Sequence, residues 1–213
     1  MNYAHKLVTA AQRSHVSRTH VIFQDTLLTH AQSKGGMTAL FAQANKSGIC
    51  AALTVKFVEA AMLGRLAQFN QNSLAETLLS ALRSQFGGSF FSLLSGGAKW
   101  NFEISAAHLN PVVVPVAAAD TATAFMVAMR AAIMKAVSAL ANTVAIGMAG
   151  DGGHVIGLKV VPGGISSFFD ANAGLYQFPS VDDLRAFWRA AYEAAEYGFT
   201  SFTVVTFGKM PPL

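Results

Sequence analysis

Residues 45–57 read NKSGICAALTVKF and contain the only cysteine of the 213-residue chain. Polar residues and a glycine precede Cys50, and an apolar run follows it. Within that run, Leu53 and Phe57 are spaced so that they fall on one face of a helix. We therefore predict a helix that spans about residues 48–66 and buries this face.

Cys50 is predicted to lie in the first turn of this helix, with Ser47 as the N-cap residue. At that position the helix dipole and the free backbone N–H groups favour a thiolate over a thiol. A thiolate is a nucleophile, and the N–H groups beside it can bind an oxyanion. The alternative is that Cys50 is a small buried hydrophobic residue, as most lone cysteines are.

The composition indicates a single folded domain without a disulfide. Hydrophobic residues make up 53% of the chain and charged residues 12%, which argues against a chain that is disordered throughout. The net charge is only +4, and Lys and Arg are scattered rather than gathered in a basic stripe, so we expect no nucleic-acid partner. One cysteine excludes an intramolecular disulfide and is compatible with a reducing cytosol.

The most apolar stretch, residues 121–141, is predicted to be a helix buried mostly in protein and not a transmembrane segment. Arg130 and Lys135 lie within it, and each would cost about 2.5–3.5 kcal/mol near the centre of a bilayer. We also expect no signal peptide, because Lys6 and Arg13 near the N-terminus are not followed by a continuous apolar core.

Residues 1–35 are rich in Thr, Ser, Gln and His and are predicted to form a polar, flexible N-terminal segment with a short strand over residues 20–23. A turn signal at residues 33–36 marks its boundary with a folded domain over residues 36–213. The segment contains four histidines: His5, His15, His20 and His30. Zinc ligands are usually spaced more closely or are joined by Cys or Asp, so we predict no metal site.

The middle of the chain gives weaker signals. Ser73 and Glu76 form a capping-box pattern for a helix over residues 74–86. Residues 87–97 are apolar between two glycine pairs and fit either a short buried helix or the wall of a cleft. Three valines between two prolines at residues 111–115 indicate an extended connection or an edge strand.

From residue 144 onward, hydrophobic residues recur with the two-residue period that is typical of β-strands. Strands are predicted over residues 144–149, 154–161, 165–169, 175–178 and 199–207. Glycine-containing turns separate the first four. Ser180 with Asp183 caps a helix that runs to about Tyr197. The core face of this helix is predicted to hold Leu184, Phe187, Trp188 and Ala191. Helices followed by an antiparallel sheet make an α+β fold.

His154 opens one predicted strand and Asp170 closes the next. Adjacent antiparallel strands can place these side chains side by side on one face. With Cys50 at a helix terminus, this is the chain order of papain-like chemistry, in which Cys attacks a carbonyl carbon, His transfers the proton and the acid orients the imidazole. In the alternative interpretation Asp170 only forms a turn and His154 is only a polar residue at a strand end.

Three motifs resemble the YopT/AvrPphB-type cysteine peptidases, a papain-like group of bacterial effectors delivered into host cells. The motifs are GICAAL (residues 48–53), GHV (153–155) and FFDANAGLYQF (168–178). The family pattern at the third motif is close to Asp-Pro-Asn-x-Gly. Ala171 stands where proline is usual, which loosens the turn after the acid but leaves the acid in place. The resemblance covers about residues 45–207.

The resemblance implies a papain-like catalytic domain over residues 36–213, with Cys50, His154 and Asp170 as its triad. In this family an Asn five residues before the nucleophile contributes to the oxyanion hole. The resemblance therefore implies that role for Asn45, which in the alternative interpretation is an ordinary loop residue. No cofactor and no metal are implied.

The implied activity is that of a thiol protease, a secreted effector or toxin that cleaves a protein in the cytosol of a target cell. A secretion chaperone is an additional candidate partner. One alternative is a glutamine deamidase or transglutaminase toxin, which would use the same triad. A second alternative is an interaction domain that keeps the fold but has no catalytic activity. The long, weakly charged segments 87–97 and 100–115 are typical of an open apolar groove and favour proteolysis.

Overall fold

The computed structural model describes residues 18–20, 22, 24–33, 49–75, 111–114, 127, 130–131, 134, 142–150, 153–192 and 199–208. Within these residues the helices are α2 (Gln24–Ser33), α4 (Cys50–Met62) and α9 (Val181–Tyr192), together with the short 3-10 helix η1 (Leu66–Gln68). Both Cys50 and the pair His154 and Asp170 lie in the described part of the chain.

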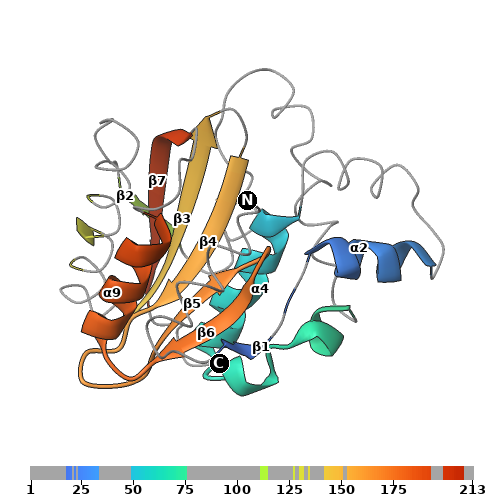
Figure 1. The fold of residues 1–213 in the computed structure, drawn as a ribbon, viewed down its shortest axis with the longest axis horizontal. Helices are drawn as coiled ribbons and strands as arrows, with labels where there is room; N and C mark the ends of the chain where they lie inside the picture. The colour runs from blue at the N-terminus through green and yellow to red at the C-terminus, as the bar shows by residue number, and fades with distance from the viewer. Residues whose placement is uncertain are drawn as a thin grey trace.

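A seven-stranded antiparallel sheet forms the centre of the described structure (Figure 1). Its strands are β1 (Arg18–His20), β2 (Pro111–Val114), β3 (Thr143–Gly150), β4 (Gly153–Lys159), β5 (Ser166–Asp170), β6 (Gly174–Phe178) and β7 (Phe199–Phe207). Their order in the sheet is β1-β6-β5-β4-β3-β7-β2, and each neighbouring pair is antiparallel. The α+β class predicted from the sequence is confirmed.

The five strands predicted in the last third of the chain are all present, with small shifts at their ends. β2 lies at the edge of the sheet beside β7, as its proline predicts, because proline has no N–H to donate to a second neighbour. The strand predicted over residues 20–23 was wrong in position, since β1 ends at His20. Its three residues carry no hydrophobic alternation, and only pairing with β6 reveals the strand.

Two adjacent phenylalanines show that different helices cover the two faces of the sheet. Successive side chains of a strand point to opposite faces. Phe169 stacks on Phe57 of α4, with ring centroids 5.4 Å apart. Phe168 contacts Phe187 of α9, with ring centroids 5.5 Å apart. α4 and α9 therefore lie on opposite sides of the sheet, and α4 lies behind the strands in the view of Figure 1.

α4 is shorter than predicted, and its cap differs. It begins at Cys50, so the cysteine is in the first turn as predicted, but Ile49 occupies the N-cap position without a side-chain hydrogen bond. The prediction of Ser47 as the N-cap was therefore wrong. Ile49 is fully buried, and apolar packing holds the start of this helix. The helix ends at Met62 because Gly64 adopts a left-handed conformation, with φ of +70°.

The helix predicted over residues 74–86 begins about one turn earlier, at residue 71. Residues 71–75 are already helical, so Ser73 lies inside the turn and not at its N-cap. Oδ1 of Asn70 accepts the N–H groups of Asn72 and Ser73, and Oγ of Ser73 accepts the N–H of Asn70. This reciprocal arrangement is a capping box centred on Asn70. Asn is as good an N-cap as Ser, so local sequence did not distinguish the two.

α9 begins as the sequence predicts. Oγ of Ser180 accepts the N–H of Asp183 at 3.1 Å, and Oγ donates to Oδ2 of Asp183 at 2.6 Å. Leu184 and Phe187 are fully buried, which confirms this part of the predicted core face. The side chains of Trp188 and Ala191 lie outside the described residues.

The polar N-terminal segment contributes to the core. β1 extends the sheet beside β6, and α2 follows it. Ile22, Leu27 and Leu28 are buried in the cluster that includes α4. The domain boundary between residues 35 and 36 stays a prediction, because residues 34–48 lie outside the described part of the chain.

Other predictions for the middle of the chain fall mostly on residues that the structure does not describe, among them 76–110 and 115–126. In the apolar stretch 121–141, the described residues 127, 130, 131 and 134 are helical. Val127 and Met134 are 50% and 56% exposed, so this side of the helix is not buried as predicted.

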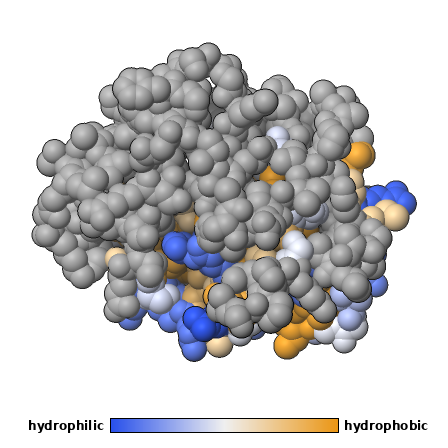
Figure 2. Space-filling view, turned by 180° about the vertical axis from the view of Figure 1, so that it is seen from behind, coloured by the Kyte–Doolittle hydropathy of each residue, from blue (hydrophilic) through white to orange (hydrophobic). Residues whose placement is uncertain are grey.

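Among the described residues, no helix combines the length and the hydrophobicity needed to cross a membrane. Figure 2 shows the side of the molecule opposite to that in Figure 1. On the described part of this surface, hydrophobic and hydrophilic residues lie interspersed.

Gly157 of β4 allows α4 to pack against the sheet, which gives a first prediction. A Cβ at this position would overlap the ring of Phe57, which is fully buried and packs against both Phe69 and Phe169. Gly157→Ala should therefore lower the free energy of unfolding by about 1–3 kcal/mol in urea denaturation. Gly208→Ala is the control, because a Cβ there meets nothing within 4 Å. Equal stability of the two variants would contradict this packing.

Candidate active site

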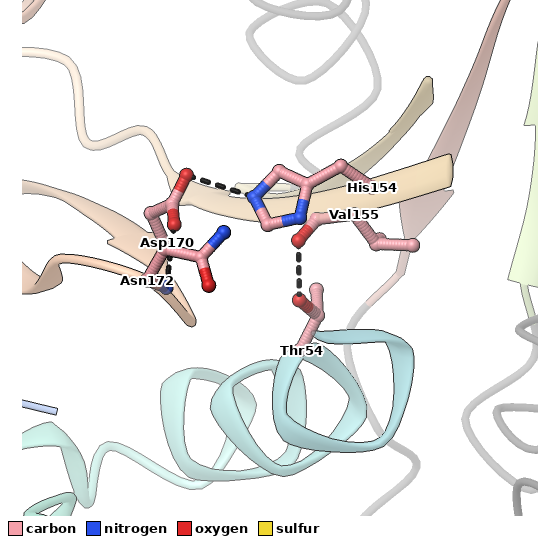
Figure 3. Close-up of polar contacts among 5 residues, drawn as sticks. All are labelled: Thr54, His154, Val155, Asp170 and Asn172. Carbon is pink, nitrogen blue, oxygen red and sulfur yellow. Dashed lines mark hydrogen bonds and ion pairs between the residues drawn. The ribbon is translucent and has the colours of Figure 1, made fainter. Parts of the chain in front are cut away.

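The imidazole of His154 and the carboxyl group of Asp170 are in contact at one end of the sheet (Figure 3). Nε2 of His154 lies 2.9 Å from Oδ2 of Asp170. The strand register explains the contact, because Ile156 pairs with Asp170 and His154 lies two residues before Ile156 on the same face. Asp170 is fully buried and His154 is 7% exposed, so little water competes for this contact. The predicted side-by-side placement is confirmed.

The turn after β5 holds the carboxyl group of Asp170 in place. Its second oxygen, Oδ1, accepts the backbone N–H of Asn172 at 2.7 Å (Figure 3). Its backbone carbonyl accepts the N–H of Ala173 at 3.0 Å, which closes the turn. Ala171 is fully buried in this turn. Backbone hydrogen bonds thus orient Asp170. They do so although Ala171 occupies the position where the peptidase family that the sequence resembles usually has proline.

Cys50, the first residue of α4, meets the other side of the imidazole. It is 6% exposed, and its side chain lies close enough to the imidazole of His154 to raise the pKa of that ring. Because Nε2 faces Asp170, Nδ1 is the ring nitrogen that remains for Cys50, and in Figure 3 it points toward α4. His154 therefore lies between a thiol and a carboxyl group, the order that a nucleophile, a base and its orienting acid require.

The surroundings of His154 favour its charged form. Burial by itself lowers the pKa of this imidazole, but the charge of Asp170 and the hydrogen bond to it act in the opposite direction. The hydrogen bond and the charge of Cys50 add to this effect. Together these partners raise the pKa of His154 from 6.5 to about 10. At neutral pH His154 is thus held as an imidazolium beside Cys50.

Contacts between α4 and β4 bring the three residues together. Oγ1 of Thr54, one turn after Cys50, donates to the carbonyl oxygen of Val155 at 3.2 Å (Figure 3). Near the other end of the helix, Nζ of Lys159 donates to the carbonyl oxygen of Ala61 at 3.0 Å. We did not predict Thr54 as a functional residue from the sequence. The signal that could have found it is a polar, β-branched side chain in an otherwise apolar helix, four residues after the cysteine.

Asn45, the predicted oxyanion-hole residue, lies outside the described residues. In the described part of the chain, no group of three His, Cys, Asp or Glu side chains could hold a metal ion.

Comparison with known proteins shows a distant similarity of fold to a solved structure. No family model matches the chain, and no curated protein matches it. Among solved structures, the fold is similar to that of the Pseudomonas avirulence protein AvrPphB, with a TM-score of 0.45 and 17% sequence identity. The match covers 75% of this chain and 90% of that one.

The raised pKa of His154 predicts how stability depends on pH. A group whose pKa is higher in the folded state stabilises the fold fully below its unfolded value of 6.5, and this contribution is lost as pH rises toward about 10. Asp170→Asn removes the charge that raises this pKa most. It should lower the free energy of unfolding by roughly 1–3 kcal/mol at pH 6 and by less at pH 9.

The measurement is urea denaturation of both proteins at several pH values between 6 and 10. NMR titration of the imidazole should show a lower pKa of His154 in Asp170→Asn. If the free energies of unfolding of the unmodified protein and Asp170→Asn differ by the same amount at every pH in this range, the charged pair of His154 and Asp170 is contradicted.

Proposed function

We propose that this protein is a cysteine peptidase that uses Cys50 as nucleophile, His154 as acid and base, and Asp170 as the orienting acid. One observation carries the proposal: the buried imidazole of His154 contacts Asp170 at 2.9 Å and interacts with Cys50 as a second polar partner. A cysteine that served only as packing would need neither a charged imidazole beside it nor a carboxyl group behind that imidazole. The sequence motifs around the three residues support the same assignment.

In the first half of the reaction, the thiolate of Cys50 attacks the carbonyl carbon of an amide and forms a C–S bond. The electron pair of the carbonyl moves onto its oxygen. His154 then gives the proton on Nδ1 to the amide nitrogen, the C–N bond breaks, and the amine leaves. A thioester on Cys50 and a neutral imidazole remain.

In the second half, a water molecule gives a proton to Nδ1 of His154 while its oxygen attacks the thioester carbon. The C–S bond breaks, the acid product leaves, and the thiolate and imidazolium are restored. Asp170 keeps its negative charge throughout, because its role is to hold Nε2–H and stabilise the imidazolium. No cofactor takes part in these steps.

The oxyanion of each step needs hydrogen-bond donors. The N–H of Cys50 lies in the first turn of α4, where backbone N–H groups have no acceptor within the helix. We assign a second donor to the side-chain amide of Asn45, on the strength of its place five residues before the nucleophile. Two donors at this position are the usual requirement of acyl transfer through a thioester.

We place the activity in a secreted bacterial effector that cleaves a protein in the cytosol of a target cell. This assignment rests on the sequence motifs that resemble the YopT/AvrPphB-type peptidases. The peptide amide and the glutamine side-chain amide present the same carbon to a thiolate, so deamidation or transglutamination by the same triad is the competing outcome of the test.

Exposure of target-cell proteins to the active chain tests the reaction. The active protein and Cys50→Ala are each incubated with a cell extract, and the proteins are compared by intact mass. We expect fragments only with the active protein, since the thioester cannot form without Sγ. Unbroken proteins with a Gln-to-Glu mass change would replace the protease assignment by a deamidase that keeps the triad.

The roles of the other residues predict a graded series in the rate at which fragments appear. Asp170→Ala should reduce the rate about 10³-fold or more, because the imidazole loses its orientation. Asn45→Ala should reduce it by about 10²–10³-fold, as expected for one oxyanion donor, and by less than Cys50→Ala does. Circular dichroism serves as the control for folding. Full activity in a folded Asp170→Ala variant would remove Asp170 from the triad.

A further inference from the structure

Thr54 lies in the turn of α4 that follows the nucleophile. It is four residues after Cys50, so both side chains leave the same side of the helix. Thr54 is fully buried, and its Oγ1 donates a hydrogen bond to the carbonyl oxygen of Val155. Val155 directly follows His154 in β4. One hydrogen bond therefore connects the turn next to the nucleophile with the residue next to the base.

This hydrogen bond is not the one that a threonine in a helix usually makes. The hydroxyl of a mid-helix Thr commonly returns to the carbonyl four residues earlier, which here belongs to Cys50. Thr54 instead bonds across to the strand. The pairing of β4 with β5 begins only at Ile156, so β5 has no residue paired with Val155. Thr54 therefore bonds to β4 at a residue beyond the part of the strand that pairs with β5.

We propose that Thr54 is a positioning residue, whose hydrogen bond to Val155 sets the separation between Sγ of Cys50 and Nδ1 of His154. The inference rests on the proposed function, because this separation matters only if the thiol and the imidazole react together. Thr54 touches neither reacting group through its hydroxyl. It acts by fixing how far α4 is rotated and shifted against β4.

Two other contacts between α4 and β4 lack direction or lie farther from Cys50. The packing of Phe57 over Gly157 is apolar and has no direction of its own. The hydrogen bond from Lys159 to Ala61 lies at the far end of α4. The bond made by Thr54 is directional and, unlike the bond made by Lys159, lies one turn from Cys50. A shift of about 1 Å at a reacting group can cost roughly 10²-fold in rate.

The pH dependence of Cys50 alkylation by iodoacetamide tests this role without a substrate. Thr54→Val keeps the shape of the side chain and removes the hydroxyl, and Thr54→Ser keeps the hydroxyl. Thr143→Val is the matched control. Thr143 is also fully buried, and its hydroxyl bonds to Oδ1 of Asn142 at 3.1 Å, but it lies opposite Lys159 at the far end of β4.

In the unmodified protein we expect rapid alkylation at neutral pH, because the positive charge of His154 favours the negative charge on Sγ of Cys50 as it attacks. Thr54→Val should be alkylated about tenfold more slowly at pH 7 and should regain speed only in the alkaline range. Thr54→Ser and Thr143→Val should keep the original profile. The inference is overturned if Thr54→Val keeps that profile, if Thr54→Ser fails to restore it, or if Thr143→Val slows alkylation as much.

Urea denaturation shows whether each variant is folded. If Thr54→Val does not fold, Thr54→Ala replaces it as the variant without a hydroxyl, and an unchanged profile in Thr54→Ala would overturn the inference. The two proposals fail in different ways. Slow alkylation of the unmodified protein at neutral pH would overturn the proposed function together with the role of Thr54. A fast neutral reaction that survives the loss of the hydroxyl would overturn the role of Thr54 alone.

Discussion

The packing of α4 against β4 is the contact on which the candidate site depends. Gly157 has no side chain, so the ring of Phe57 can lie directly on the strand and stack on Phe169. Phe69 closes the same cluster with an edge-on contact. Burial of these aromatic side chains stabilises the contact between helix and sheet. It also brings the first residue of the helix to the end of β4 where His154 stands.

A buried charge is the second constraint. An imidazolium taken out of water is unfavourable unless opposite charge and hydrogen bonds compensate for the lost solvation. Asp170 supplies both to Nε2 of His154, and the turn after β5 in turn orients Asp170 through the N–H of Asn172. Cys50 supplies the partner on the other side of the ring. In the proposed function, the same arrangement also places a proton donor, His154, beside the nucleophile Cys50.

Several features could be predicted because their causes lie within a few residues. The strands of the last third follow from alternation and glycine turns, and the start of α9 follows from the reciprocal bonds of Ser180 and Asp183. Prediction failed where local signals compete or are missing. Asn70 and Ser73 are both good N-caps, and the structure uses Asn70. β1 has no pattern of its own, since its pairing with β6 alone makes it a strand.

The residue pattern was enough to indicate which side chains are candidates for the chemistry. It placed Cys50 at a helix start, His154 at a strand start and Asp170 at the end of the next strand, and the short separation of the last two made their contact foreseeable. The contact of Cys50 with His154 was decided only by the tertiary structure, because it joins distant parts of the chain. The roles of Gly157 and Thr54 were decided in the same way: each acts through a partner about a hundred residues away, Phe57 for one and Val155 for the other. Local propensities carry no information about such partners, since only the packing of helix on sheet selects them.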